Sequence, residues 1–108
     1  MENKNVQKTL QALGLCAKAR RLVTGTPMIC EALRGKNKPY LVLCASDNSE
    51  NTEKKLTDKT TFYGVPTVKL DCNGEALAAA VGKKSRVAAV AVCDENLSKL
   101  VESTLGKN

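Results

Sequence analysis

The sequence predicts an α/β protein, a three-layer α/β/α sandwich built on a four-stranded mixed sheet. Two observations predict this fold class. Segments with a helical spacing of apolar residues alternate along the chain with short, continuous apolar runs, and only a few residues connect one segment to the next. This alternation is typical of helices packed on both faces of a sheet. A length of 108 residues, 43% of them hydrophobic, suits one domain with a real core, so residues 1–108 are expected to form a single domain.

The N-terminal part of the chain predicts two helices and a short segment between them. From Asn5 to about Ala19, apolar residues recur on one helical face. The segment 20–25 is too short for a helix and predicts a short strand or a turn. Thr26-Pro27 predicts a helix start, with a hydroxyl N-cap and proline in the first helical position, and the helix ends at Gly35. The residues expected on its inner face are Met28, Ile29, Ala32 and Leu33.

The middle of the chain predicts a buried strand followed by a helix. The run Tyr40–Ala45 is nearly all apolar, which predicts a strand covered on both faces. A helix then runs to about Tyr63, where Gly64 and Pro66 end it. Three residues suit the N-cap of this helix: Asp47, Asn48 and Ser49.

The C-terminal part predicts two strands and two helices. The strands are expected over Val65–Leu70 and Val87–Cys93. Between them, Asn73 suits the cap of a short alanine-rich helix over Glu75–Val81, and a basic loop follows that helix. Asp94 is expected to cap a last helix that runs to Leu105.

The charge of the chain predicts a polyanionic partner. Seventeen lysine and arginine residues against eleven acidic ones give a net charge of +6, and nucleic acid is the commonest large anion. Aromatic residues make up only 3% of the chain, which argues against a sheet that stacks RNA bases. Recognition of nucleic acid is therefore expected to rest on phosphate contacts, backbone groups and shape.

The sequence indicates neither an enzyme nor a metal site. It has no histidine, its five cysteines form no C-x-x-C pair, and it contains no glycine-rich nucleotide-binding motif. Asp47 and Asp94 follow predicted strands, where catalytic acids often lie, but each also suits a helix cap, the commoner role. We expect a non-catalytic, soluble, cytoplasmic protein with no cofactor, no catalytic or metal-binding residues and no membrane contact.

Basic residues are the remaining candidates for a binding site. Lys54 and Lys55 follow a strand and a polar loop, at the sheet edge where α/β proteins bind anions. The loop 83–86 and the turn 24–27 both lie beside helix ends, where free N–H groups reach a phosphate. The four basic groups are Lys18/Arg20/Arg21, Arg34/Lys36/Lys38, Lys54/Lys55/Lys59 and Lys83/Lys84/Arg86. Each group alone is more often a solvated surface than a site.

Seven segments of the chain form a recognisable combination in this order: Leu13–Gly25, Ala32–Gly35, Tyr40–Asp47, Asn51–Lys55, Tyr63–Pro66, Val81–Lys84 and Val90–Asp94. Together they resemble the bacterial YlxQ-type members of the ribosomal L-seven-Ae/L-thirty-e family over nearly the whole chain. The resemblance implies an α/β/α sandwich that binds structured RNA, in several relatives a kink-turn. It places the RNA at the turn and helix start 25–29, at the edge after the strand 40–45, and at the loop before the last strand.

One segment departs from the family pattern. Relatives use Gly-x-Asn-Glu-x-x-Lys to reach the sheared guanines of a kink-turn, and residues 25–31 occupy the matching positions. Gly25 is kept, but Pro27, Met28 and Glu31 replace the other three residues. Proline has no backbone donor, methionine cannot accept from a guanine edge, and glutamate repels phosphate. Recognition by backbone and shape is expected to persist, while base-specific recognition of a kink-turn stays open.

The leading hypothesis is a monomeric, non-catalytic protein that binds structured RNA, ribosomal RNA first of all, with a ribosome-associated protein as a further partner. The candidate RNA-binding residues are Arg20, Arg21, Gly25, Thr26, Pro27, Met28, Arg34, Lys36, Lys54, Lys55, Lys83, Lys84, Ser85 and Arg86. Two alternatives remain. One is a protein-interaction module of the same fold, in which Met28 and Ile29 form hydrophobic contacts. The other is a detached RNA-recognition domain of a modifying enzyme.

Overall fold

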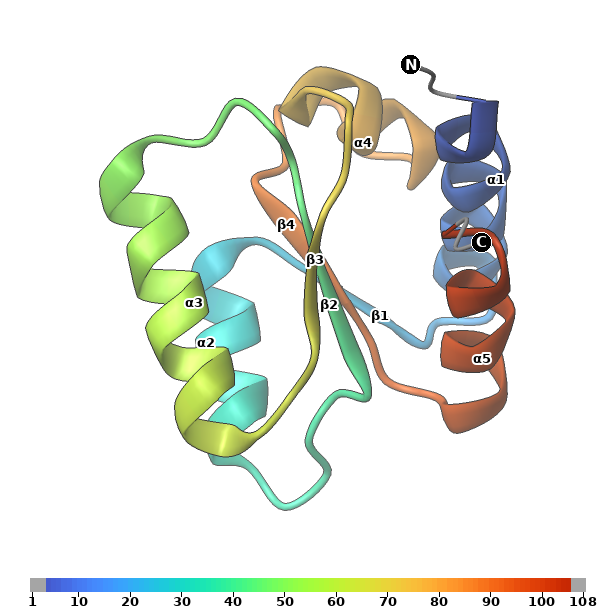
Figure 1. Cartoon of the computed structure of the whole chain (residues 1–108). Helices are drawn as coiled ribbons and strands as arrows, with labels where there is room; N and C mark the ends of the chain where they lie inside the picture. Colours follow the sequence, from blue (N-terminus) through green and yellow to red (C-terminus); the bar gives the residue numbers. More distant parts are fainter. Residues whose placement is uncertain (1–3, 106–108) are drawn as a thin grey trace.

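The computed structural model describes residues 4–105, so the predicted single domain of 1–108 extends beyond the described residues at both ends. Within this range five helices alternate with four strands (Figure 1). They are α1 (Lys4–Lys18), β1 (Leu22–Thr24), α2 (Thr26–Arg34), β2 (Leu41–Cys44), α3 (Glu50–Tyr63), β3 (Thr67–Lys69), α4 (Gly74–Ala80), β4 (Ala89–Val92) and α5 (Glu95–Ser103). Every predicted element is present, and β2, β3 and β4 are shorter than predicted by one or two residues at each end.

The four strands form one mixed sheet in the order β1-β4-β2-β3. β2 and β3 are parallel, whereas β4 is antiparallel to both of its neighbours, β1 and β2. The carboxyl ends of β1, β2 and β3 therefore meet the amino end of β4 at one side of the sheet, which we call the carboxyl edge. The opposite side, where β2 and β3 begin, is the amino edge.

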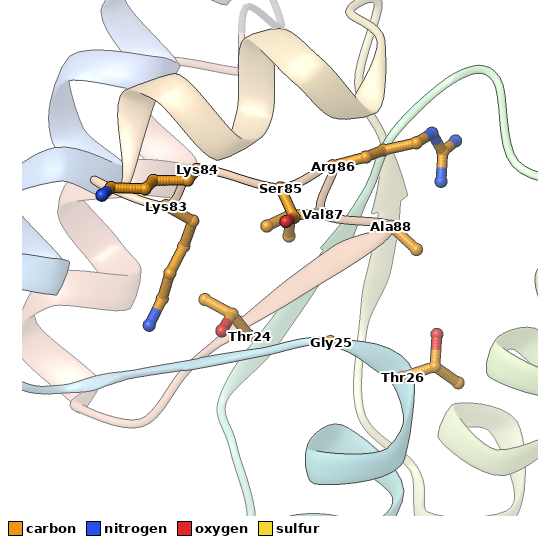
Figure 2. Close-up of a pocket in the computed structure, with 9 residues that line it drawn as sticks. All are labelled: Thr24, Gly25, Thr26, Lys83, Lys84, Ser85, Arg86, Val87 and Ala88. Atoms are coloured by element: carbon orange, nitrogen blue, oxygen red, sulfur yellow. The ribbon is translucent and has the colours of Figure 1, made fainter.

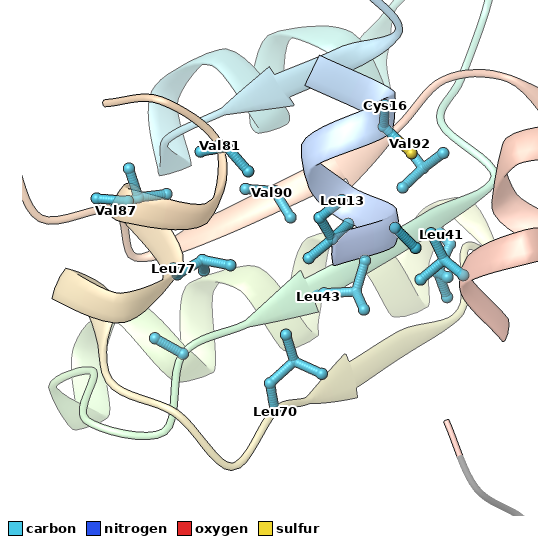
Figure 3. Close-up of a cluster of buried hydrophobic side chains, with 14 residues drawn as sticks. Leu13, Cys16, Leu41, Leu43, Leu70, Leu77, Val81, Val87, Val90 and Val92 are labelled. Atoms are coloured by element: carbon cyan, nitrogen blue, oxygen red, sulfur yellow. The ribbon is translucent and has the colours of Figure 1, made fainter. Parts of the chain in front are cut away.

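Helices cover both faces of this sheet (Figure 1). Successive side chains of a strand point to opposite faces, so each central strand contributes to two hydrophobic clusters. Leu41, Leu43, Val90 and Val92 pack against α1, α4 and α5, as Figure 3 shows. Val42, Cys44, Ala89 and Ala91 pack against α2 and α3. The three-layer sandwich and its four-stranded mixed sheet are confirmed, and β2 and β4 are buried along their whole length.

Side-chain caps begin three of the helices. Ser49 accepts a hydrogen bond from the backbone N–H of Thr52 at the start of α3. Asn73 and Asp94 do the same at the starts of α4 and α5. At the end of α3, Gly64 adopts the left-handed conformation with φ 72°. The predicted caps at Asn73 and Asp94 are thus confirmed, and of the three candidates for α3 the cap is Ser49.

The start of α2 differs from the prediction in two ways. The predicted hydroxyl cap at Thr26 is wrong: the N-cap is Gly25, and no side chain caps the helix. The inner face also differs, because Ile29 and Leu33 are fully buried whereas Met28 is 57% exposed. Met28 lies one residue before Ile29, and a step of one residue turns a side chain by about 100° around the helix. Met28 is therefore available to solvent or to a partner.

The helices of residues 4–105 include none that is long and apolar enough to span a bilayer.

Candidate nucleic-acid interface

Three helices begin at the carboxyl edge, because α2, α3 and α4 each follow a strand that ends there. The N-terminus of a helix has free N–H groups and a partial positive charge, which attract anions. In α3 and α4 a capping side chain already accepts from a free N–H group, and acidic residues of the first turn already balance the partial positive charge. In α2 the first turn has neither a side-chain cap nor an acidic residue. The start of α2 is therefore the one among these three that is open to an external anion.

A surface groove of about 540 Å³ adjoins the start of α2 (Figure 2). One wall is the turn that leads from β1 into α2, and the other is the loop that leads from α4 into β4. The lining residues are Thr24, Gly25, Thr26, Lys83, Lys84, Ser85, Arg86, Val87 and Ala88. The backbone N–H of Gly25 donates to the carbonyl of Ala89 at 3.0 Å, which ties the first wall to the beginning of β4. The two walls thus hold a fixed position relative to each other.

Gly25 adopts a backbone conformation that residues with a side chain rarely adopt. Its φ of 91° and ψ of 144° lie in a region that side chains rarely allow. In this conformation the chain turns sharply from β1 into α2, and the carbonyl of Gly25 accepts from the N–H of Ile29 at 3.0 Å. Glycine is needed here to present the helix start to the groove.

Lys83 and Lys84 provide the free positive charge of the groove. Both side chains are exposed, and neither has an acidic partner within ion-pair distance among residues 4–105. Figure 2 shows Lys83 extending toward the side of the groove where Thr24 lies, while Lys84 points outward from the loop. Two ammonium groups, nearby hydroxyls and an open helix start form a set of donors that suits phosphate oxygens.

Arg86, in contrast, is not a free cation. Its Nη2 donates to Oδ1 of Asp47 at 2.6 Å, to the carbonyl of Asp47 at 3.0 Å and to Oδ1 of Asn48 at 3.0 Å. Figure 2 shows its side chain extending away from Lys83 and Lys84. The guanidinium lowers the pKa of the Asp47 carboxyl below its ordinary value. The sequence predicts Arg86 as a phosphate contact, but its charge is already paired with Asp47 at the surface of the protein.

The contacts of Arg86 belong to a wider network that joins three loops. Oδ1 of Asp47 also accepts from the N–H of Gly74 at 3.0 Å, and the carbonyl of Gly74 accepts from the N–H of Val87 at 3.1 Å. The side chain of Asn48 donates to the carbonyl of Ala88 at 3.0 Å. The loops after β2, β3 and α4 are thereby fastened together, so the loop carrying Lys83 and Lys84 rests on a fixed base.

The other predicted site residues do not gather at this groove. Lys54 and Lys55 lie near the start of α3 at the carboxyl edge. Nζ of Lys54 lies 3.4 Å from Oδ2 of Asp58. Arg20 and Arg21 precede β1 and lie at its far end, where the N–H of Cys93 donates to the carbonyl of Arg21 at 2.8 Å. Arg34 and Lys36 lie at and beyond the C-terminus of α2, about 13 Å from its start.

The predicted RNA-binding residues therefore fall into two groups. Gly25, Thr26, Pro27, Met28, Lys54, Lys55, Lys83, Lys84, Ser85 and Arg86 lie at the carboxyl edge. Arg20, Arg21, Arg34 and Lys36 lie away from it.

Sequence reasoning missed that Asp47, Asn48 and Gly74 support the groove. Their partners in the network around Arg86 are between 13 and 40 residues away, so no local pattern reveals the pairing. One signal does exist. Polar residues follow both β2 and β3, and because these strands are parallel neighbours, the residues after them meet at the same edge.

Four of the five cysteines are poor nucleophiles in this fold. Burial raises the pKa of the Cys44 thiol to about 11, and burial also raises the pKa values of Cys16, Cys72 and Cys93. These thiols are therefore protonated at neutral pH, the unreactive form. Among residues 4–105, no three potential ligands of the types His, Cys, Asp and Glu lie together in a way that would hold a metal ion.

Fold and sequence together identify the class of protein. Residues 7–102 match the model of the ribosomal protein L7Ae/L30e/S12e/Gadd45 family, and the chain belongs to that family. It is 38% identical over 93 residues to the RNA-binding protein YlxQ of Bacillus subtilis (strain 168), covering 86% of this chain and 90% of that protein. It is 36% identical over 87 residues to RNA-binding protein YlxQ of Enterococcus faecium, covering 81% of this chain and 82% of that protein. The chain is a YlxQ-like member of the family, which confirms the predicted resemblance.

Solved structures share the fold. A protein of unknown function from Bacillus halodurans C superposes with a TM-score of 0.79 at 33% identity, covering 95% of this chain and 97% of that one. The Giardia lamblia 15.5 kD RNA binding protein superposes with a TM-score of 0.76 at 18% identity, covering 96% of this chain and 88% of that one. At such low identity the second likeness concerns the fold alone.

Proposed function

We propose that this protein is a non-catalytic RNA-binding protein that holds structured RNA at the carboxyl edge of its sheet. The observation that carries the proposal is the open start of α2 facing two unpaired lysines, Lys83 and Lys84, across one groove. The names of the two curated relatives, both RNA-binding proteins, support it, as does the net charge of +6. Other donors at the same edge are Lys54 and Lys55.

The donors at the start of α2 suit phosphate better than a base edge. Pro27 has no N–H, so the free donors of the first turn are the N–H groups of Thr26 and Met28. The side chains of Pro27 and Met28 offer no acceptor for a guanine, and Glu31 lies exposed one turn further along the helix. We therefore propose that phosphates and backbone shape dominate recognition, and that a kink-turn would be bound through its bent backbone.

The biological setting is part of the same proposal. Membership of a family named for ribosomal proteins supports ribosomal RNA as the ligand, a ribosome-associated protein as a further partner and the cytoplasm as the compartment. We propose that the protein acts as a monomer.

The proposal is tested by measuring RNA affinity against salt. Fluorescence anisotropy with a labelled kink-turn hairpin, at several potassium chloride concentrations, gives the slope of log K against log salt. Replacing Lys83 and Lys84 together by alanine should weaken binding and reduce the slope by roughly 0.7 to 0.9 for each phosphate that the variant no longer neutralises. The matched control replaces Lys8 and Lys99, which lie on α1 and α5 and change the net charge equally.

Three results would contradict this proposal. One is the absence of binding to any structured RNA at low salt. Another is a complex that is insensitive to salt. The third is an equal loss of affinity in the Lys83/Lys84 and Lys8/Lys99 variants, which would indicate general attraction instead of a site.

A protein-interaction role is the second candidate, and the exposure of Met28 favours it. An apolar side chain that is 57% exposed at the start of a helix is a suitable contact for a protein partner. Pull-down from cell extract with and without RNase separates the two candidates, because RNA-bridged partners disappear after nuclease treatment.

A further inference from the structure

All three aromatic residues of the chain lie at the amino edge, at the opposite end of α3 from the groove. Tyr40 directly precedes β2, and Phe62 and Tyr63 end α3 just before β3. The interior of the protein is built from aliphatic side chains, while Phe62 is 79% exposed and Tyr40 is 46% exposed. A sequence with one phenylalanine thus places that residue in water, where it gains no stability from burial.

The Tyr63 ring is held against a basic loop and packs against Phe62. The rings of Phe62 and Tyr63 pack edge to face, with centroids 4.9 Å apart and planes at 89°. Nζ of Lys38 lies 5.4 Å from the centroid of the Tyr63 ring and donates to the carbonyl of Gly35 at 3.1 Å. The loop after α2 is therefore anchored beside the aromatic pair, and the rings have a defined orientation.

Positive charge dominates this part of the surface. Arg34, Lys36 and Lys38 are exposed and have no acidic partner within ion-pair distance among the described residues. Lys59 lies one turn before Phe62 on α3.

Acidic groups near this surface do not cancel its charge. Asp58 lies one turn before Phe62 on α3, where its carboxylate is paired with Nζ of Lys54 at 3.4 Å. Glu31 lies one turn before Arg34 on α2. At the amino edge, Asp94 and Glu95 belong to the other helix layer, where Asp94 caps α5 and Glu95 lies 3.9 Å from Lys99.

An exposed ring among unpaired cations suits one class of ligand. A single-stranded nucleic acid has flat bases that stack on an aromatic ring and phosphates that pair with cations, and such stacking is largely independent of sequence. An apolar protein surface would cover the ring but leave the cations without counterions, and duplex RNA keeps its bases inside the helix.

We propose that Arg34, Lys36, Lys38, Phe62 and Tyr63 form a second surface, the aromatic–basic surface, that binds a single-stranded segment of RNA. A base stacks on Phe62, and the adjoining phosphates pair with the cations of the loop after α2. This inference rests on the proposed function in one respect: the structured RNA held at the carboxyl edge supplies the single-stranded extension. α3 has 14 residues, so the two surfaces lie about 20 Å apart and an extension of several nucleotides is needed.

The single phenylalanine makes a direct test possible. The protein is prepared with fluorine-labelled phenylalanine, which gives one ¹⁹F signal from Phe62. Titration with an adenine oligonucleotide of about ten nucleotides should shift this signal, and the shift should diminish at high salt. Anisotropy is then measured with a kink-turn hairpin alone and with the same hairpin carrying a single-stranded adenine tail. The tail should strengthen binding about tenfold.

Variants separate the contributions of ring and charge. Phe62→Leu keeps an apolar side chain without a ring and should abolish the effect of the tail, whereas Phe62→Tyr should retain it. Lys36→Ala should weaken binding of the tail with a smaller salt slope. Leu100→Ala, which truncates another exposed hydrophobic residue at 41% exposure, is the control and should change nothing.

The outcomes distinguish this inference from the proposed function. If the hairpin binds but the tail adds no affinity and the Phe62 signal stays unchanged, the aromatic–basic surface is overturned and the groove proposal stands. If the hairpin fails to bind while the oligonucleotide shifts Phe62, the surface stands and the groove proposal fails. A Phe62 signal that moves with protein concentration and not with RNA would identify a second copy of the chain as the partner, and would overturn the inference.

Discussion

Nη2 of Arg86 lies 2.6 Å from Oδ1 of Asp47 and joins two loops that are 39 residues apart in the sequence. The same nitrogen also bonds to the carbonyl of Asp47 and to the side chain of Asn48. Arg86 therefore positions the loop that carries Lys83 and Lys84, the two lysines proposed to bind RNA. An arginine close to the proposed RNA surface thus holds the loops of that surface in place instead of binding the ligand itself.

The ion pair between Asp47 and Arg86 should make the stability of the fold depend on pH. The pKa of Asp47 is lowered in the folded protein, mainly by its hydrogen bond with Arg86. The pair thus stabilises the fold above the ordinary aspartate pKa, near 4, and this contribution is lost as pH falls through the lower folded value. Asp47→Asn should lower the melting temperature by a few degrees at most at pH 7, because the pair is exposed, and the difference should vanish in acid. A difference that grows on acidification would contradict this assignment.

Substitutions at Gly74 and Arg86 should have coupled effects on stability. A Cβ atom at this position would lie 2.5 Å from Cγ and 2.8 Å from Nε of Arg86. Gly74→Ala should therefore displace the arginine and destabilise the protein by about 1 kcal/mol in urea unfolding. In an Arg86→Ala background the same change should cost little, because the clash is absent and alanine favours the helix. Additive effects in this double-mutant cycle would show that the two side chains are not coupled.

Substitution of Gly25 should carry a conformational cost that substitution of Gly35, at the other end of α2, does not. Its φ of 91° is unfavourable for any side chain, so Gly25→Ala should destabilise the protein by about 1 to 2 kcal/mol and weaken RNA binding by disturbing the start of α2. Gly35 has φ −81° and serves as the control, with an expected change within about 0.5 kcal/mol. Unfolding in urea and RNA anisotropy check both variants. Equal effects of the two substitutions would exclude the conformational explanation.

Two adjacent residues of α2 should respond very differently to truncation. Ile29 is fully buried between α2, α3 and the sheet, so Ile29→Ala should cost about 2 to 4 kcal/mol in unfolding free energy. Met28 is exposed, so Met28→Ala should change stability by less than about 0.5 kcal/mol. A large stability loss in the methionine variant would place its side chain inside the core.

The buried thiol of Cys44 should resist alkylation. Its pKa is raised to about 11, chiefly by burial, and it is 5% exposed. Iodoacetamide at a mildly alkaline pH should leave Cys44 unmodified in the folded protein and modify it in urea, as peptide mass spectrometry would reveal. Rapid alkylation in the folded state would mean that the strand β2 opens readily or that the thiol is not buried.

Local signals account for the parts of the fold that the sequence predicts. Helix caps act within three residues, so Asn73 and Asp94 are recognisable from their own neighbourhood. The left-handed Gly64 is equally local. Strand order is not local, and nothing near β4 in the sequence reveals that it lies between β1 and β2. The fold class is therefore predictable, while the arrangement of the strands requires the structure.

The candidate site shows the same division. Local chemistry and the family resemblance predict the turn at Gly25 and the loop at Lys83, and their role as RNA contacts stays a prediction. The pairing of Arg86 is not predictable, because a sequence does not show which cations are neutralised across 39 residues. The predicted inner position of Met28 is wrong because five apolar residues in a nine-residue helix fit more than one inner face, and Cys30 is buried instead.

The central place of β4 has a consequence for synthesis on the ribosome. Among the described strands β1 pairs only with β4, and β4 also pairs with β2, so the sheet stays incomplete until the residues from Ala89 onward have emerged. The two walls of the groove come together in the same step, through the hydrogen bond from Gly25 to Ala89. A nascent chain therefore gains its fold and its proposed RNA site simultaneously, and a product truncated before Ala89 should be a protease substrate with no partial activity.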